Sequence, residues 1–264
     1  MTTALTDTPL VTLADGVLTV PVSLEGKGNS LDSDAVDQAG IALRALLAGE
    51  IDAGAVLLVG LGKNFCNGGN VPGFAAAENR SEHVRELADR LHAVVRMLDE
   101  VTVPVVAAVA GWAAGAGASL AMSADFSVCG PATRLLAAYP GIGLSPDGGM
   151  SWRLPRAAGQ AVARSFILGN EPMDGERAYQ LGLLTMFVEG DVRDAARDLA
   201  VRLAAGPRES YAATKALLRA SESATLSDQL DAERDSIARL AVSRDGVEGV
   251  DAFVAKRSPE FGRG

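Results

Sequence analysis

Residues 105–121 read VVAAVAGWAAGAGASLA, and this stretch decides the fold class. The apolar run 105–109 predicts a buried strand, and the small residues after it predict a tight turn that leads into a helix. The segment 55–70, AVLLVGLGKNFCNGGN, repeats the order of a buried apolar run and a glycine-rich turn. Because segments with helical periodicity flank both strands, the sequence predicts an α/β protein with largely parallel strand pairing.

The rest of the chain divides into a strand-containing part and a helical part. Alternating apolar residues on both sides of Asp15-Gly16 predict a hairpin, and apolar spacing predicts helices over 33–49 and 82–100. The remaining predicted helices span 157–168, 174–181, 191–205, 208–221, 226–243 and 246–256, with one apolar run at 183–188. Thr225 with Asp228 three positions later predicts a helix start. We therefore expect a core over 1–200 and a C-terminal helical oligomerisation region over 201–264.

Composition excludes several classes of function. A chain of 264 residues with 48% hydrophobic content can bury one substantial core. A net charge of −9 without a basic cluster argues against nucleic-acid binding. No apolar run approaches the roughly 20 residues of a membrane span, and no secretory signal is evident, so we expect no membrane partner and a cytoplasmic location. The two cysteines, Cys66 and Cys129, predict buried, inert thiols and no metal site.

The two glycine-rich turns indicate the chemistry. Small residues let a ligand approach the main chain closely, and a helix N-terminus adds unpaired N–H groups. Two N–H donors that converge from separate turns can bind an oxyanion. The pair Gly115-x-Gly117 after a strand is also the start of a dinucleotide-binding turn, but Leu120 stands where a third Gly or Ala is required. A serine hydrolase is excluded too, because residues 117–121 do not form the G-x-S-x-G motif.

Five motifs, taken in order, resemble the crotonase (enoyl-CoA hydratase/isomerase) superfamily. Residues 65–70, FCNGGN, resemble its F-(C/S)-x-G-x-D turn, and residues 104–120 resemble its second glycine-rich motif. The likeness extends through NSL at 29–31 and GIGLSPDGG at 141–149 to AFVAKR at 252–257. Each motif alone is weak, but five in this order are specific and cover essentially the whole chain.

This resemblance implies a fold, a ligand and a set of site residues. The fold is a spiral of ββα units with a C-terminal helical trimerisation region, assembled as a homotrimer or a dimer of trimers. The ligand is an acyl-CoA thioester whose enolate the enzyme stabilises, with no cofactor besides the CoA of the substrate. The oxyanion N–H groups fall on Gly69 and Ala116. The implied contacts to substrate and CoA are Lys27, Asn29, Phe65, Gly68, Asn70, Ser119 and Tyr139, with Phe253 and Lys256 supplied by a neighbouring subunit.

The acid–base residues depart from the hydratase pattern. Enoyl-CoA hydratases carry two glutamates that activate water, and Ser119 and Tyr139 occupy those places here. Asp147 matches the catalytic Asp of dienoyl-CoA isomerases and of the ring-epoxide isomerase. One carboxylate suffices for a double-bond shift, because it can remove a proton from C2 and return it to C4. The sequence therefore favours an isomerase, with a hydratase of low activity and a non-catalytic acyl-CoA-binding protein as alternatives.

Several side chains have a structural interpretation beside the functional one. Asp147 is also suited to cap a helix that begins near Gly148. Tyr139 is expected to be mainly a packed aromatic residue. The two histidines, His83 and His92, are expected on the solvated surface of the helix over 82–100, and the two tryptophans, Trp112 and Trp152, are expected either to line the acyl cavity or to pack in the core.

Overall fold

The computed structural model describes residue 5, residues 8–31 and residues 33–262. Its larger sheet has the strand order β1-β2-β3-β4-β6-β9. The strands are β1 (Thr12–Ala14), β2 (Val17–Leu24), β3 (Ala55–Leu61), β4 (Val105–Ala108), β6 (Phe126–Cys129) and β9 (Met186–Phe187). β1 and β2 are antiparallel, and every other neighbouring pair is parallel. The expected hairpin and parallel α/β architecture are confirmed.

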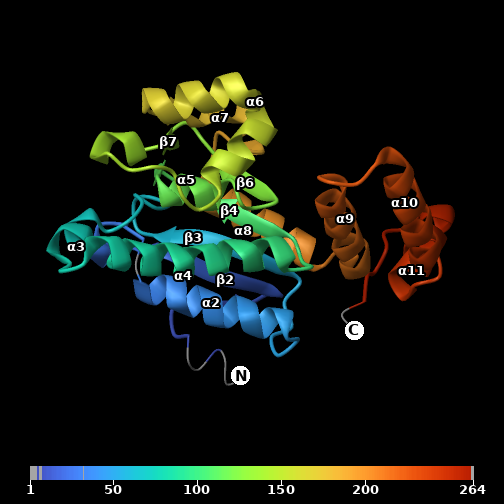
Figure 1. Cartoon of the computed structure of the whole chain (residues 1–264). Coiled ribbons are helices and arrows are strands. Elements are labelled where there is room, and N and C mark those ends of the chain that lie inside the picture. The colour runs from blue at the N-terminus through green and yellow to red at the C-terminus, as the bar shows by residue number, and fades with distance from the viewer. Residues whose placement is uncertain (1–4, 6–7, 32, 263–264) are drawn as a thin grey trace.

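Both faces of the larger sheet are covered, which explains its continuous apolar strands. In β3, Ala55 and Leu57 face α8 (Val192–Ala204). The alternate residues Val56 and Leu58 belong to the main core, which includes α2 (Ser33–Leu47) and α4 (Arg80–Glu100). Figure 1 shows α2 and α4 side by side along one face of the sheet.

A second, smaller sheet follows the glycine-rich turns. It has the order β5-β7-β8, with β5 (Trp112–Ala114), β7 (Arg134–Leu136) and β8 (Met173–Asp174). The short helices of the chain include α3 (Val71–Ala76), α5 (Ala116–Ala121), η1 (Glu25–Lys27), η2 (Tyr139–Ile142) and α7 (Gly175–Gln180), of which α5 and α7 contact this sheet. The helix expected over 157–168 is longer, because α6 (Met150–Gly169) starts directly after Gly148-Gly149 and continues across a kink at Gly159 (φ 80°). Repeating β-β-α units thus place several loops at one end of the strands, in the spiral arrangement that was expected.

The last three helices form an arm beside the sheet (Figure 1). They are α9 (Arg208–Ser221), α10 (Leu226–Leu240) and α11 (Arg244–Ala255), and Thr225 caps α10 as expected. The Lys215 ammonium lies 2.6 Å from Asp125, which ties α9 to the core. The arm exposes apolar side chains of Leu226, Leu230, Ile237, Val242, Val250, Phe253 and Val254. The division at residue 200 stays a prediction. None of the helices in the described part of the chain is both long and apolar enough to cross a membrane.

Candidate active site

The two glycine-rich turns lie against each other. The Cys66 N–H donates to the Trp112 carbonyl at 3.1 Å, and the Ala114 N–H donates to the Cys66 carbonyl at 2.9 Å. A Cβ atom on Gly117 would collide with the Cys66 main chain, so only glycine allows this approach. The contact fixes the relative position of the main chain in both turns.

Gly69 and Ala116 both line one cavity. Ala116 is the first residue of α5 and follows Gly115, whose φ of 53° favours glycine. Neither N–H donates a hydrogen bond to a residue in the described part of the chain. The space over Gly69 is filled by Phe74, because a Cβ at position 69 would lie 2.7 Å from the Phe74 Cζ atom. The pair can therefore bind an oxyanion without first breaking internal hydrogen bonds.

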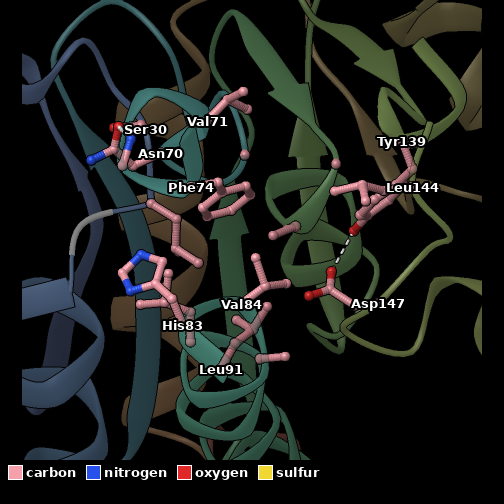
Figure 2. Close-up of a pocket in the computed structure, with 18 of the residues that line it drawn as sticks. Ser30, Asn70, Val71, Phe74, His83, Val84, Leu91, Tyr139, Leu144 and Asp147 are labelled. Atoms are coloured by element: carbon pink, nitrogen blue, oxygen red, sulfur yellow. Dashed lines mark hydrogen bonds between the residues drawn. The ribbon is translucent and has the colours of Figure 1, made fainter. Parts of the chain in front are cut away.

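The cavity between the turns and α4 has a volume of about 790 Å³. Its apolar lining comes from Leu31, Val36, Val71, Phe74, Val84, Leu87, Leu91, Ile142, Leu144 and Pro146. In Figure 2, Tyr139, Leu144 and Asp147 lie on one side, and Ser30, Asn70 and His83 lie on the other. Three cations also line it: Lys27, which was expected, and Arg85 and Arg90, which sequence reasoning missed. A cavity of this size with an apolar wall and local cations suits an anionic ligand that has an apolar end.

Asp147 and Tyr139 form a hydrogen-bonded pair on the cavity wall. The Tyr139 hydroxyl donates to Asp147 Oδ1 at 2.6 Å (Figure 2). Burial raises the pKa of Tyr139 well above its usual range, and the Asp147 charge raises it further. Tyr139 therefore stays a phenol. Its ring is 9% exposed and packs in the main core, as expected, while the residue also lines the cavity. The other carboxylate oxygen, Oδ2, accepts no hydrogen bond from the described residues.

Asp147 does not cap the helix that follows it. The N-cap of α6 is Gly149, and no side chain makes a capping hydrogen bond there. The helix starts with Met150, whose N–H reaches only the Asp147 main-chain carbonyl, at 3.2 Å. The capping interpretation of the sequence is therefore wrong, and the carboxylate is left facing the cavity.

The two histidines had been expected on the solvated surface of α4. The structure instead shows both of them partly buried and in contact with other segments. His83 lines the cavity, and its ring meets Phe74 edge-on with centroids 6.2 Å apart. His92 is half-buried, and its Nε2 atom accepts a hydrogen bond from the Gly148 N–H at 3.1 Å. The available sequence signal was that His92 lies next to Leu91, a member of the buried stripe Leu91, Val94, Met97 and Leu98 of α4, and so at the edge of that stripe.

The expected substrate contacts separate into two groups. Lys27, Gly68 and Asn70 line the cavity as expected. Two others face the interior instead. Phe65 is fully buried in the core, and Asn29 is 4% exposed, with its amide donating to the Leu61 carbonyl at 3.2 Å. These two residues shape the turns, so direct ligand contact is not supported for them.

Ser119 also lies behind the cavity wall. It is 1% exposed, and its hydroxyl donates to the Asp147 main-chain carbonyl at 2.9 Å. The hydroxyl also lies 3.4 Å from the Tyr139 oxygen. Ser119 thus supports the Asp147 segment, and the expectation that it contacts substrate is not supported.

The tryptophans and the C-terminal residues lie away from this cavity. Trp112 and Trp152 are 37% and 40% exposed and do not line it, and the Arg156 guanidinium stacks 4.0 Å from the Trp152 ring centroid. Neither expected location, acyl cavity or core, is therefore correct for them. Phe253 is 84% exposed on α11, and Lys256 follows that helix. Their expected contact with the ligand of a neighbouring subunit stays a prediction.

Comparison with known proteins is consistent with this geometry. The family model described as enoyl-CoA hydratase/isomerase matches residues 13–264. The 1,2-epoxyphenylacetyl-CoA isomerase of Escherichia coli K12 is 37% identical over 212 residues, 78% of this chain and 80% of the relative. A probable enoyl-CoA hydratase of Rhodobacter capsulatus is 37% identical over 211 residues, 80% of this chain and 81% of the relative. The crystal structure of an enoyl-CoA hydratase/isomerase homologue from Mycobacterium abscessus aligns with a TM-score of 0.88 at 33% identity, covering 96% of this chain and 98% of that one.

Proposed function

We propose a specific reaction for this chain, which belongs to the enoyl-CoA hydratase/isomerase family of acyl-CoA-binding enzymes. The reaction moves the double bond of a 3-enoyl-CoA to the 2-position, with Asp147 as the single acid–base residue. One observation carries the proposal: Asp147 lines the same cavity as Gly69 and Ala116, whose N–H groups donate to no residue in the described part of the chain. A base and an oxyanion site in one cavity are the two components that proton abstraction next to a thioester requires.

The proposed reaction has two proton transfers. The thioester oxygen lies between the Gly69 and Ala116 N–H groups, and Asp147 removes a proton from C2. The electron pair moves into the thioester to give a dienolate, which the two N–H donors stabilise. Asp147 returns the same proton to C4, and the double bond forms between C2 and C3. No net proton or electron is exchanged, so the chemistry requires no cofactor besides the CoA of the substrate.

The hydrogen bond from Tyr139 favours Asp147 as a base that accepts the substrate proton, rather than a site that activates water. Its hydroxyl already donates to Asp147 Oδ1, which leaves Oδ2 for the substrate proton. The Ser119 hydroxyl donates to a main-chain carbonyl at 2.9 Å. Neither hydroxyl is a base that activates water, which favours the isomerase over the low-activity hydratase. A cavity-facing carboxylate likewise favours the enzyme over a non-catalytic acyl-CoA-binding protein.

The ligand has a proposed orientation in the cavity. The acyl group lies against Phe74, Leu91 and Leu144, and the CoA phosphates lie toward Lys27 and Arg85. The name of the 37%-identical Escherichia coli relative supports testing a ring-epoxide thioester as a second substrate. We further propose that the C-terminal helices build a trimer or a dimer of trimers, in which Phe253 and Lys256 reach the cavity of a neighbouring subunit.

The test uses purified protein with a 3-enoyl-CoA and a 2-enoyl-CoA, followed by the gain and the loss of conjugated absorbance. The wild-type chain should conjugate the 3-enoyl substrate. Asp147→Asn should lower that turnover by about 10²- to 10⁴-fold, the usual contribution of a general acid–base group. The matched control is Asp191→Asn, because Asp191 caps α8 away from the cavity and Asn caps equally well.

Each alternative gives a different result. Undiminished turnover by Asp147→Asn would refute the role of Asp147. Hydration of the 2-enoyl substrate without isomerisation would establish the hydratase instead. Binding of acyl-CoA without turnover of either substrate or of the ring-epoxide thioester would establish a non-catalytic acyl-CoA-binding protein.

A further inference from the structure

The peptide unit between Asp147 and Gly148 is held at both ends. Its carbonyl, on Asp147, accepts from the Ser119 hydroxyl at 2.9 Å. Its N–H, on Gly148, donates to His92 Nε2 at 3.1 Å. Ser119 belongs to α5, whose first residue is Ala116, and His92 belongs to α4, which lines the cavity. The two anchors thus connect the Asp147 main chain to α4 and α5, two of the helices that border the site.

The segment around this peptide needs such anchors. Gly148 and Gly149 have φ values of 60° and 85°, and consecutive glycines give a chain many accessible conformations. Residues 141–145, which precede Asp147, are exposed. The chain around Asp147 is therefore restrained weakly by its own conformation. The two hydrogen bonds to the peptide unit hold the main chain, and the Tyr139 hydroxyl holds the carboxylate.

His92 does not itself line the cavity, although Leu91 and Arg90 beside it do. Its Nε2 atom accepts a hydrogen bond from the Gly148 N–H at 3.1 Å. A ring behind the cavity wall cannot exchange protons with a substrate. It can only fix the group that does.

We propose that His92 is a positioning residue for Asp147, acting through the Gly148 N–H. This inference rests on the proposed function, because it assigns His92 a role in the same reaction. Losing the acceptor frees the peptide unit and lets Asp147 move from its place beside the thioester C2. A displacement of about 1 Å in a reacting group can cost about 10²-fold in rate.

The experiment compares two substitutions at one position. His92→Phe keeps a planar ring and removes the acceptor, whereas His92→Gln places a carbonyl oxygen near the original Nε2. We expect His92→Phe to lower kcat for the 3-enoyl-CoA by about 10- to 100-fold with KM changed less than about threefold. His92→Gln should recover most of the lost kcat. Binding of a saturated acyl-CoA, measured by calorimetry, should be the same in all three proteins.

The outcomes separate this inference from the proposed function. Wild-type kcat in His92→Phe, or equal losses in the Phe and Gln variants, would overturn the positioning role. Loss of acyl-CoA binding together with kcat would also overturn it, since that pattern indicates a general structural defect. If His92→Phe does not fold, His92→Leu provides the same comparison. Failure of the proposed function would be seen instead as full activity in Asp147→Asn.

Discussion

Replacing Gly69 by Ala tests the oxyanion site through a collision that the structure defines. The φ angle of Gly69 is not in the left-handed region, so the main chain itself accepts an alanine. The new Cβ would lie 2.7 Å from the Phe74 Cζ atom, whereas carbon atoms in ordinary contact are about 3.5–4.0 Å apart. One of the two groups must therefore move by about 1 Å. If Gly69 moves, its N–H leaves the position from which it is proposed to bind the thioester oxygen.

Misplacing one oxyanion donor costs about 2.7–4 kcal/mol, so Gly69→Ala should lower kcat by about 10²- to 10³-fold. The assay is the conjugation of a 3-enoyl-CoA at saturating substrate. Adding Phe74→Ala removes the colliding ring, so the double variant should regain the activity of Phe74→Ala alone. Gly190→Ala is the matched control, because a Cβ there meets no atom within 4 Å. Unchanged kcat in Gly69→Ala, or a double variant no better than Gly69→Ala, would refute the reasoning.

Two further predictions concern stability and assembly. Burial raises the pKa of Cys66 to about 12, so the unfolded thiol loses its proton first, and stability should fall as pH rises above about 9. In urea unfolding measured from pH 8 to 10.5, this thiol should lower the free energy of unfolding by about 1.4 kcal/mol per pH unit above about pH 9. Cys66→Ala should lack this contribution, and the same pH dependence in wild type and variant would contradict the prediction. Phe253 is 84% exposed, so sedimentation should give a trimer or hexamer for the wild type and smaller species for Phe253→Asp. A monomeric wild type would exclude the expected assembly.

The long elements of the fold were predictable because their patterns are local. The hairpin at Asp15-Gly16 and the run at 55–60 depend on neighbouring residues, and so does α10 with its Thr225 cap. β5 and β7 have three residues each, too few for any periodicity, and β5 lies within a stretch interpreted as a turn. The helix expected over 157–168 begins earlier, at Met150, directly after Gly148-Gly149.

The candidate site was predictable where the main chain determines it. The two glycine-rich turns were identified from small residues after buried strands, and the family resemblance then singled out Gly69 and Ala116, which both line the cavity. The partners of Asp147 could not be predicted, because they depend on contacts between segments far apart in the chain. The Gly148 N–H donates a hydrogen bond to His92, which is 56 residues away in the chain. The local sequence pattern of α4 does not indicate that partner.

The close packing of Ser119 against Gly148 limits how this site can change. Even a Cβ on Gly148 would lie 2.8 Å from the Ser119 Cβ atom, and Ser119 is 1% exposed. A glutamate at position 119, as enoyl-CoA hydratases resembling this chain carry, would have no room unless the segment bearing Asp147 moved outward. A glutamate there would therefore displace Asp147, the proposed acid–base residue. On this proposal, exchange between the isomerase and hydratase chemistries needs a rebuilt loop rather than a single replacement at this helix.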